Sequence, residues 1–259
     1  MIALLWLSSA LAAEPATVQL DAELGFLAPL YHRIQFGQQG TELNYISEGG
    51  QDNLFAIGRA TATVARAKNR YTFVWQPLEL RSTVAIPHEW QVDSVVFDAG
   101  QPVDLRYGFS FWRASWGRTV WSNANTELSL GLGMQIRNAT IGFTAVDGSR
   151  AEFNRDIGPV PLLESELRHR TAGGGFFEVE LDGFYAPIKY LNGRGVDVVG
   201  AIVDAQVRWG IPMDEQYDAW LGVRYLAGGG SGTGTPDDTS DGYTKNWLQF
   251  ATVTLGIRR

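Results

Sequence analysis

Strict alternation of apolar and polar residues is the feature of this sequence that most restricts its fold. Between Leu128 and Arg137 every even-numbered residue is apolar, and every odd-numbered residue is Ser, Gly, Gln or Arg. Successive side chains of a β-strand point to opposite faces, so this period predicts a strand with one apolar and one polar face. Val18–Phe26 and Ala251–Arg258 show the same pattern. The chain is therefore expected to be all-β.

About ten such strands can be followed along the chain. Eight are possible if two weak strands are loop hairpins, and twelve if loop segments such as Ile141–Phe153 are counted. Near Pro77 the apolar residues change parity, which suggests a bulge, and Leu105, Tyr107, Phe109 and Phe111 are expected to face outward. The expected strands are 18–26, 54–64, 71–84, 105–116, 128–136, 163–168, 177–185, 201–211, 219–225 and 251–258.

The connections between these strands alternate in length. Short turns are expected near 66–70, 121–125, 172–175 and 212–217. Long loops are expected near 27–52, 86–103, 138–157, 188–196 and 228–244. Short turns at one end and long loops at the other are typical of outer-membrane barrels. We therefore expect an antiparallel up-and-down transmembrane β-barrel.

The two faces of the strands support a membrane location. The apolar faces are long enough to cross a bilayer, which takes ~9–11 residues of a tilted strand. The opposite faces carry charges and would line the lumen. Aromatic side chains near strand ends would form a girdle at the membrane interfaces. This expected girdle comprises Tyr71, Trp75, Tyr107, Trp112, Trp116, Tyr185 and Trp209.

The first residues are expected to be a signal peptide, so that the domains are 1–13, the signal peptide, and 14–259, the barrel. Ile2–Leu7 is an apolar core, and Ser8–Ala13 offers small residues for cleavage. The chain has no Cys, so disulfides do not stabilise it. The net charge of -7 argues against nucleic acid as a partner, because a phosphate backbone requires a basic surface.

The leader and the alternating strands together resemble outer-membrane β-barrel proteins of Gram-negative bacteria, over nearly the whole chain. Three segments, 34–37, 48–52 and 104–109, are similar to those of an uncharacterised barrel family with no assigned activity. The resemblance implies location in the outer membrane of a Gram-negative bacterium. It also implies outer-membrane lipid and the barrel assembly machinery as partners, with the protein itself a monomer.

The candidate functional residues are the charged residues expected in the lumen. Both signs are present in nearly equal number, so they could neutralise one another and fill a narrow barrel. The favoured function is a structural or surface-exposed role with a largely charge-filled lumen, and the alternative is a narrow pore for small polar solutes or ions. The expected lumen residues are Asp21, Glu23, Arg59, Glu79, Arg81, Arg106, Arg137, Glu164, Glu166, Arg168, Glu178, Glu180, Asp182, Asp204, Arg208 and Arg224.

An enzyme at the rim of the barrel is a second alternative, and we expect none. His32 or His88 could act with Asp52, Asp93 or Asp98 on the long loops, but no motif supports this. Ser165 and His169 are about 13 Å apart along one strand, too far for a catalytic pair.

No catalytic residue, metal site or cofactor is predicted. Asp237–Gly242 resembles the start of a calcium loop, but Leu248 stands at the position of the closing Glu, so a flexible external loop is favoured. The 27–52 loop is long enough to fold inward as a plug or ligand contact, with Tyr31, Phe36 and Tyr45.

Overall fold

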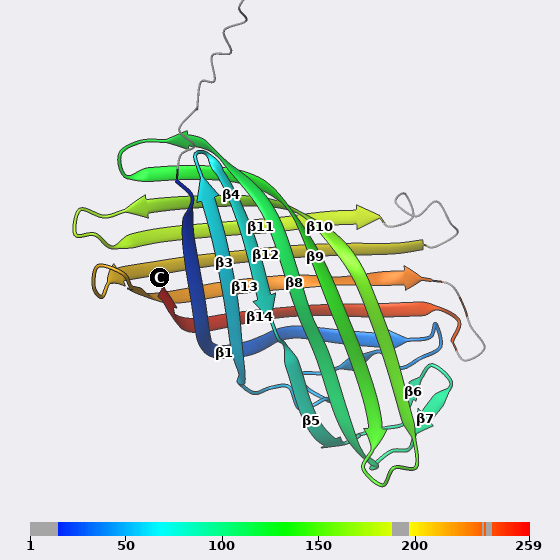
Figure 1. The fold of residues 1–259 in the computed structure, drawn as a ribbon. Coiled ribbons are helices and arrows are strands. Elements are labelled where there is room, and N and C mark those ends of the chain that lie inside the picture. The colour runs from blue at the N-terminus through cyan, green and yellow to red at the C-terminus, as the bar shows by residue number, and fades with distance from the viewer. Residues whose placement is uncertain (1–14, 188–196, 235, 237–239) are drawn as a thin grey trace, which may run out of the picture.

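The computed structural model describes residues 15–187, 197–234, 236 and 240–259, and these form an all-β chain (Figure 1). The expected signal peptide and the 188–196 loop lie outside the described residues. No helix within the described ranges is long and apolar enough to cross a membrane. The strands are β1 (Thr17–Phe36), β2 (Leu43–Asn44), β3 (Phe55–Arg66), β4 (Asn69–Gln76), β5 (Glu79–Ala85), β6 (Trp90–Val92), β7 (Val95–Phe97), β8 (Pro102–Ser122), β9 (Thr126–Ala145), β10 (Ala151–Arg170), β11 (Phe176–Pro187), β12 (Asp197–Pro212), β13 (Asp218–Thr233) and β14 (Tyr243–Arg258).

The long strands close into an antiparallel barrel. Each pairs with its neighbour in the chain, and β14 pairs with β1 from Asp21–Arg258 to Phe36–Thr244. Both β4 and β5 pair with β8 and occupy one position in the wall, so the described strands give ten positions around the ring. Closure satisfies the backbone hydrogen bonds of the wall, as a strand structure in lipid requires. The expected ten-stranded barrel is confirmed.

The two ends of the barrel differ. Short turns connect β3 to β4, β8 to β9, β10 to β11 and β12 to β13, and Thr17 and Arg258 lie at the same end. We call this the turn end and the opposite one the loop end. At the loop end the strands continue far beyond the length expected from the sequence. The 20 residues of β9 span about 66 Å, roughly twice the thickness of a bilayer core.

Toward the loop end the wall divides into two sheets (Figure 1). The β1–β3 pairing ends at Leu27–Phe55, while β1 continues along β14. On the other side, β10–β11 pairing ends at Leu163–Gly183, while β10 remains paired with β9 as far as Ala151. One sheet therefore consists of β5, β8, β9 and β10, and the other of β1, β14, β13, β12 and β11. Much of the length predicted as loops at 138–157 and 228–244 belongs to these strands.

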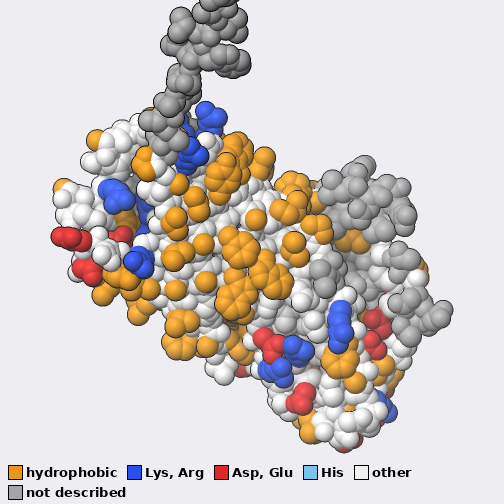
Figure 2. Space-filling view, viewed as in Figure 1, with side chains coloured by type: hydrophobic (Ala, Val, Ile, Leu, Met, Phe, Trp, Pro, Cys, Tyr) orange, Lys and Arg blue, Asp and Glu red, His pale blue; other side chains and the backbone are white. Residues whose placement is uncertain are grey.

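An apolar belt surrounds the turn-end half of the barrel. Its side chains point outward and are exposed, with Leu24 at 74% and Leu255 at 69%. Figure 2 shows the belt as a band of apolar side chains across the front of the barrel. Six of the seven expected girdle residues are exposed on this outer surface, and Tyr107 is the exception, because it is buried.

The polarity of the wall reverses between the two halves. In the turn-end half apolar side chains face outward and charged ones inward, whereas in the loop-end half Leu78, Leu80 and Leu105 face inward. The backbone continues in register through Pro77, because Gln76 pairs with Phe111 and Glu79 with Gly108. The bulge predicted at Pro77 is therefore wrong. So is the outward placement of Leu105, Tyr107 and Phe111, which are buried, and of Phe109, which packs against the same core. The alternation is unbroken, but water replaces lipid on the outside.

An apolar core fills the space between the two sheets. Phe143 of β9 contacts Phe36 of β1, Tyr45 and Phe97 of β7, with ring centroids 6.1 to 6.3 Å apart. The predicted inward fold of the first long loop is found for Tyr45, which is fully buried, and for Phe36, which lies at the end of β1. Tyr31 lies outside and is 38% exposed. The β6–β7 hairpin covers this core, and Thr41 N donates to Gln91 O at 2.8 Å.

Candidate functional site: the barrel lumen

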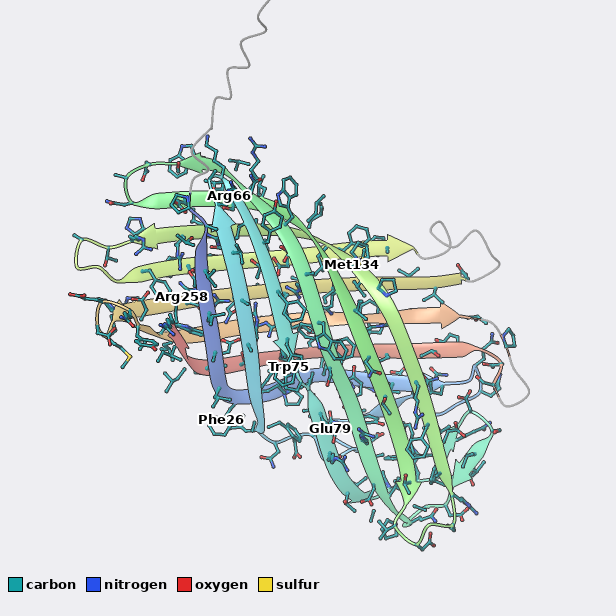
Figure 3. The ribbon with its side chains drawn as sticks, in the orientation of Figure 1. Phe26, Arg66, Trp75, Glu79, Met134 and Arg258 are labelled. Carbon is teal, nitrogen blue, oxygen red and sulfur yellow. The ribbon has the colours of Figure 1, made fainter. Side chains whose placement is uncertain are left out.

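Most of the expected lumen residues lie in the turn-end half of the lumen, where side chains from distant strands meet. Contacts between β8 and β12, or between β3 and β11, can form only across the interior, because other strands separate these pairs in the wall. Figure 3 shows Arg258 at the turn end of this region. The inward residues from the expected set are Asp21, Glu23, Arg59, Glu164, Glu166, Arg168, Glu178, Glu180, Asp182, Asp204, Arg208 and Arg224, with Arg137 higher on β9.

Nearest the turn end, Glu178 is surrounded by three arginines. Its carboxylate lies 2.5 Å from Arg208 Nη1 and 3.1 Å from both Arg258 Nη1 and Arg168 Nε. Asp21 of β1 completes the cluster through Arg258 Nε at 2.6 Å. Three cations around two carboxylates are a charge-assisted network that spans the strands β1, β10, β11, β12 and β14.

The next layer is organised around Arg59 of β3. Its Nη1 donates to Gln206 Oε1 at 2.6 Å, and its Nη2 lies 3.5 Å from Glu180 Oε2 on the opposite wall. Gln206 Nε2 in turn donates to Glu23 Oε2 at 3.1 Å. The amide of Gln206 therefore bridges a cation and a carboxylate.

The highest charged layer contains Asp204, which two arginines share. Arg224 donates through Nε to Oδ1 at 2.5 Å and through Nη2 to Oδ2 at 2.6 Å. Arg113 of β8 donates to the same Oδ2 at 2.9 Å and also pairs with Asp182. The Gln76 and Gln135 amide oxygens accept from Arg224 Nη1 and Arg113 Nη2 at 2.5 and 2.9 Å.

Aromatic rings close the lumen at the turn end. The Arg258 guanidinium lies 4.5 Å from the centroid of the Phe176 ring, and that of Arg208 lies 5.1 Å from the Trp220 ring. Glycines leave room for these rings: a Cβ on Gly256 would lie 2.2 Å from Trp220, and one on Gly210 would lie 2.2 Å from Phe176. The arginines thus contribute to the network through both charge and stacking.

Above the charged layers the lumen is apolar around the ring. One inward side chain from each of eight wall positions marks this change, and all of them are at least nine-tenths buried. They are Leu27, Ile57, Leu78, Phe111, Leu162, Ile202, Leu226 and Phe250. The loop-end half of the lumen therefore offers a solute mainly apolar side chains, with Arg137 of β9 as an inward charge at the level of Phe111.

A cavity of about 60 Å³ lies within the charged region, lined by Arg59, Arg70, Glu164, Glu166 and Asp182 among others. Such a volume has room for only a few water molecules. It lies below the apolar layer of the lumen.

Three expected lumen residues lie outside the barrel. Glu79, Arg81 and Arg106 are exposed on the outer surface beyond the apolar belt, with Glu79 accepting from Arg106 Nη2 at 2.7 Å and from Arg81 Nε at 2.5 Å. Their placement in the lumen is wrong because the wall polarity has reversed at their level. Two arginine neighbours hold the pKa of Glu79 below its usual value.

Several lumen residues were missed by the sequence analysis, chiefly Arg70, Arg113 and Arg258. The signal for them was present, because each lies next to an outward aromatic or aliphatic residue: Tyr71, Trp112 and Ile257. Arg113 was obscured because the apolar residues of this segment change from odd positions to even ones between Phe111 and Trp112.

The histidines considered for catalysis are separated from one another. His32 is 1% exposed, lies between the rings of Tyr45 and Tyr107, and shares a hydrogen bond of 2.6 Å between Nδ1 and Gln51 Oε1. His88 is exposed, and His169 Nδ1 bonds Thr126 Oγ1 at 2.8 Å. Within the described residues no cluster of His, Asp and Glu could hold a metal ion. Residues 237–239 of the considered calcium loop lie outside the description.

Comparison with known proteins bears on the fold. No family model and no curated protein matches the sequence, so the narrower resemblance to an uncharacterised barrel family stays a prediction. The outer membrane protease OmpT from Escherichia coli matches with a TM-score of 0.50 and 11% identity, covering 96% of this chain and 98% of that one.

The attachment invasion protein Ail of Yersinia pestis matches at a TM-score of 0.35 and 9% identity, covering 93% of this chain and 99% of that one. An anion-selective porin from Comamonas acidovorans matches at 0.27 and 9% identity, covering 95% and 99%. The closed ring of strands, the outward apolar belt and the similarity to OmpT agree: the chain has the fold of the outer-membrane β-barrels of Gram-negative bacteria.

Proposed function

We propose that the protein is a sealed barrel with a structural, surface-exposed role, in which the membrane-spanning half anchors the two sheets of the loop end outside the cell. One observation carries the proposal: the lumen is filled twice, by cross-barrel ion pairs in the belt region and by an apolar core above it. A solute that passed the charged layers would still meet a packed apolar interior. By the usual orientation of this class, the turn end faces the periplasm and the loop end the outside.

Conductance across a planar bilayer tests the seal. We expect no steady open level from the wild-type protein. The double variant Arg113→Ala/Asp204→Ala removes a central ion pair, and we expect it to remain closed because the apolar core is intact. Conductance should appear only when the 38–52 segment is also replaced by a short Gly-Ser linker. A steady open level in the wild type would overturn the proposal and favour the narrow pore instead.

Surface exposure is tested separately with epitope tags. Gly148 lies in the exposed turn between β9 and β10, and a Cβ there would meet nothing within 4 Å. A tag inserted after Gly148 should be labelled by antibody on intact cells. A matched tag after Glu215, in the exposed turn between β12 and β13, should be labelled only after the outer membrane is permeabilised. The reverse result would invert the orientation and remove the surface-exposed role.

A further inference from the structure

Three cations at the turn end have no counterion among the residues that the structure describes. Arg66 ends β3, Lys68 lies in the β3–β4 turn and Arg118 lies on β8, and all three are exposed. Their side chains take part in no hydrogen bond or ion pair with the described residues. Three arginines of the loop end do have counterions: Arg81 and Arg106 share Glu79, and Arg150 pairs with Asp98 at 2.9 Å.

The strand register brings these cations together on the outer face. Arg66 pairs with Asn69 of β4, and Asn69 pairs with Arg118 of β8. Two strand spacings separate the arginine Cα atoms by about 10 Å, a gap that two long side chains can close around one small anion. Lys68 is next to Asn69, and its carbonyl accepts from Thr119 N at 2.8 Å.

The surroundings place this cluster at the border of the apolar belt. Trp116, Val120 and Trp121 on β8 are 40%, 54% and 51% exposed, and Leu130 opposite Arg118 is 49% exposed. Trp116 Nε1 donates to Asn69 Oδ1 at 3.2 Å, which ties the aromatic ring to the row of the arginines. In Figure 2 basic side chains border the apolar belt at this end, and Figure 3 places Arg66 at the turn end of β3.

A charge on the lipid-facing wall is unfavourable in hydrocarbon and tolerated near the interface, where a long side chain can reach the headgroups. Arg118 has apolar and aromatic neighbours on its own strand and across it, so lipid surrounds it on the outer face. The nearest negative groups available to all three cations are then the phosphates of lipid headgroups. Guanidinium groups match phosphate geometry through paired N–H donors.

We propose that Arg66, Lys68 and Arg118 form a binding site for the phosphate group of an anionic phospholipid in the periplasmic leaflet. Arg66 and Arg118 flank the phosphate, Lys68 adds charge from the turn, and Trp116 supports the glycerol region beside Asn69. The acyl chains continue along the belt over the next row, in which Val64 pairs with Tyr71 and Tyr71 pairs with Trp116.

The test is retention of lipid by the intact folded protein, measured by native mass spectrometry during titration with dioleoyl phosphatidylglycerol or dioleoyl phosphatidylcholine in detergent. We expect the wild type to bind phosphatidylglycerol about tenfold more tightly than phosphatidylcholine. The variant R66Q/K68Q/R118Q should lose this preference, while R66K/R118K should keep most of it because the charges remain. Arg170→Gln, an exposed cation of the turn end in β10, is the matched control and should behave as wild type.

Equal affinity of the wild type for the two lipids, or an unchanged preference in the triple variant, would overturn the proposal. Folding is checked independently by the heat-dependent change in mobility on gels. Lipid affinities are compared only for the folded fraction of each variant. If the triple variant did not fold, the single variants Arg66→Gln and Arg118→Gln provide the same comparison, and a preference unchanged in both would also overturn the site.

Discussion

Arg113 on β8 reaches across the lumen to Asp204 on β12, with 2.9 Å between Nη2 and Oδ2 and both side chains almost fully buried. Asp204 is also the partner of Arg224, so one carboxylate balances two guanidinium groups from opposite parts of the wall. The pair joins the two sides of the barrel at the top of the charged layers.

Removal of this shared charge should destabilise the barrel strongly. Asp204→Asn removes the carboxylate charge that two buried arginines share, and breaking such a buried pair costs about 3–5 kcal/mol. Equilibrium unfolding in urea from lipid vesicles measures the loss. Glu79→Gln is the control, because its pairs are exposed and worth less than about 1 kcal/mol. Equal losses in the two variants would contradict the central role of Asp204.

Gly256 provides a second measurable position. Its Cβ in Gly256→Ala would lie 2.2 Å from the Trp220 ring, so the ring must move within the floor of the lumen. Overpacking of this kind costs about 1–3 kcal/mol. Gly158→Ala on β10 is the matched control, since nothing lies within 4 Å of its Cβ, and it should leave the unfolding free energy within about 0.5 kcal/mol. A stable Gly256→Ala barrel would show that Trp220 does not occupy this site.

The border of the apolar belt can be located on one strand. Leu132 and Asn138 both face outward on β9, and Leu132 lies within the belt whereas Asn138 lies beyond it. Leu132→Lys should lower the free energy of unfolding from vesicles by about 2–4 kcal/mol, the cost of a cation near the bilayer centre. Asn138→Lys should change it little, because its side chain is in water. A similar cost for both would mean that the bilayer extends further toward the loop end.

Stability should also respond to pH through His32. His32 lies in the loop-end part of β1, next to Arg33, whose side chain is 36% exposed and pairs with Glu42, and it is buried between the rings of Tyr45 and Tyr107. Burial lowers the pKa of His32 to about 4 from its usual 6.5.

Because the folded pKa is below the unfolded value, the unfolded state takes up the proton first, and stability is lost as the pH falls from 6.5 toward 4. The loss attributable to this group is at most about 3 kcal/mol. His32→Gln should remove that part of the pH dependence, as the difference between urea midpoints at pH 7.5 and 4.5 would show. His88→Gln, at an exposed position, should retain it. Identical pH profiles for wild type and His32→Gln would refute the assignment.

The strand alternation made much of the barrel predictable. Leu130, Leu132, Met134 and Ile136 face outward as predicted, and the short turns were placed correctly, because both depend only on local chemistry. Alternation shows that two faces differ and does not show which one meets lipid. That choice failed for Leu105 and Tyr107, since a strand that leaves the bilayer keeps its period while the solvent outside it changes.

The contacts between side chains within the lumen could not be predicted from the sequence, for a different reason. Arg113 could be recognised as inward because it follows the outward Trp112. Its partner on β12, however, depends on strand tilt and register around the whole ring. The burial of His32 likewise depends on the inward fold of the segment that carries Gln51. Such distant neighbours follow from the closed barrel and not from any local pattern.

The reversal of wall polarity also fixes how deeply the barrel sits in its bilayer. A shift of two residues along a strand, about 7 Å, would move belt side chains at the turn-end border such as Val18 into water or draw Arg106 and Glu79 into hydrocarbon. Arg66 and Arg118 oppose a shift in the other direction, because such a shift would draw them into hydrocarbon at the turn end. Charges that border the belt on both sides hold the molecule at one height, so in a membrane of different thickness the surrounding lipid must thin or thicken while the protein stays in place.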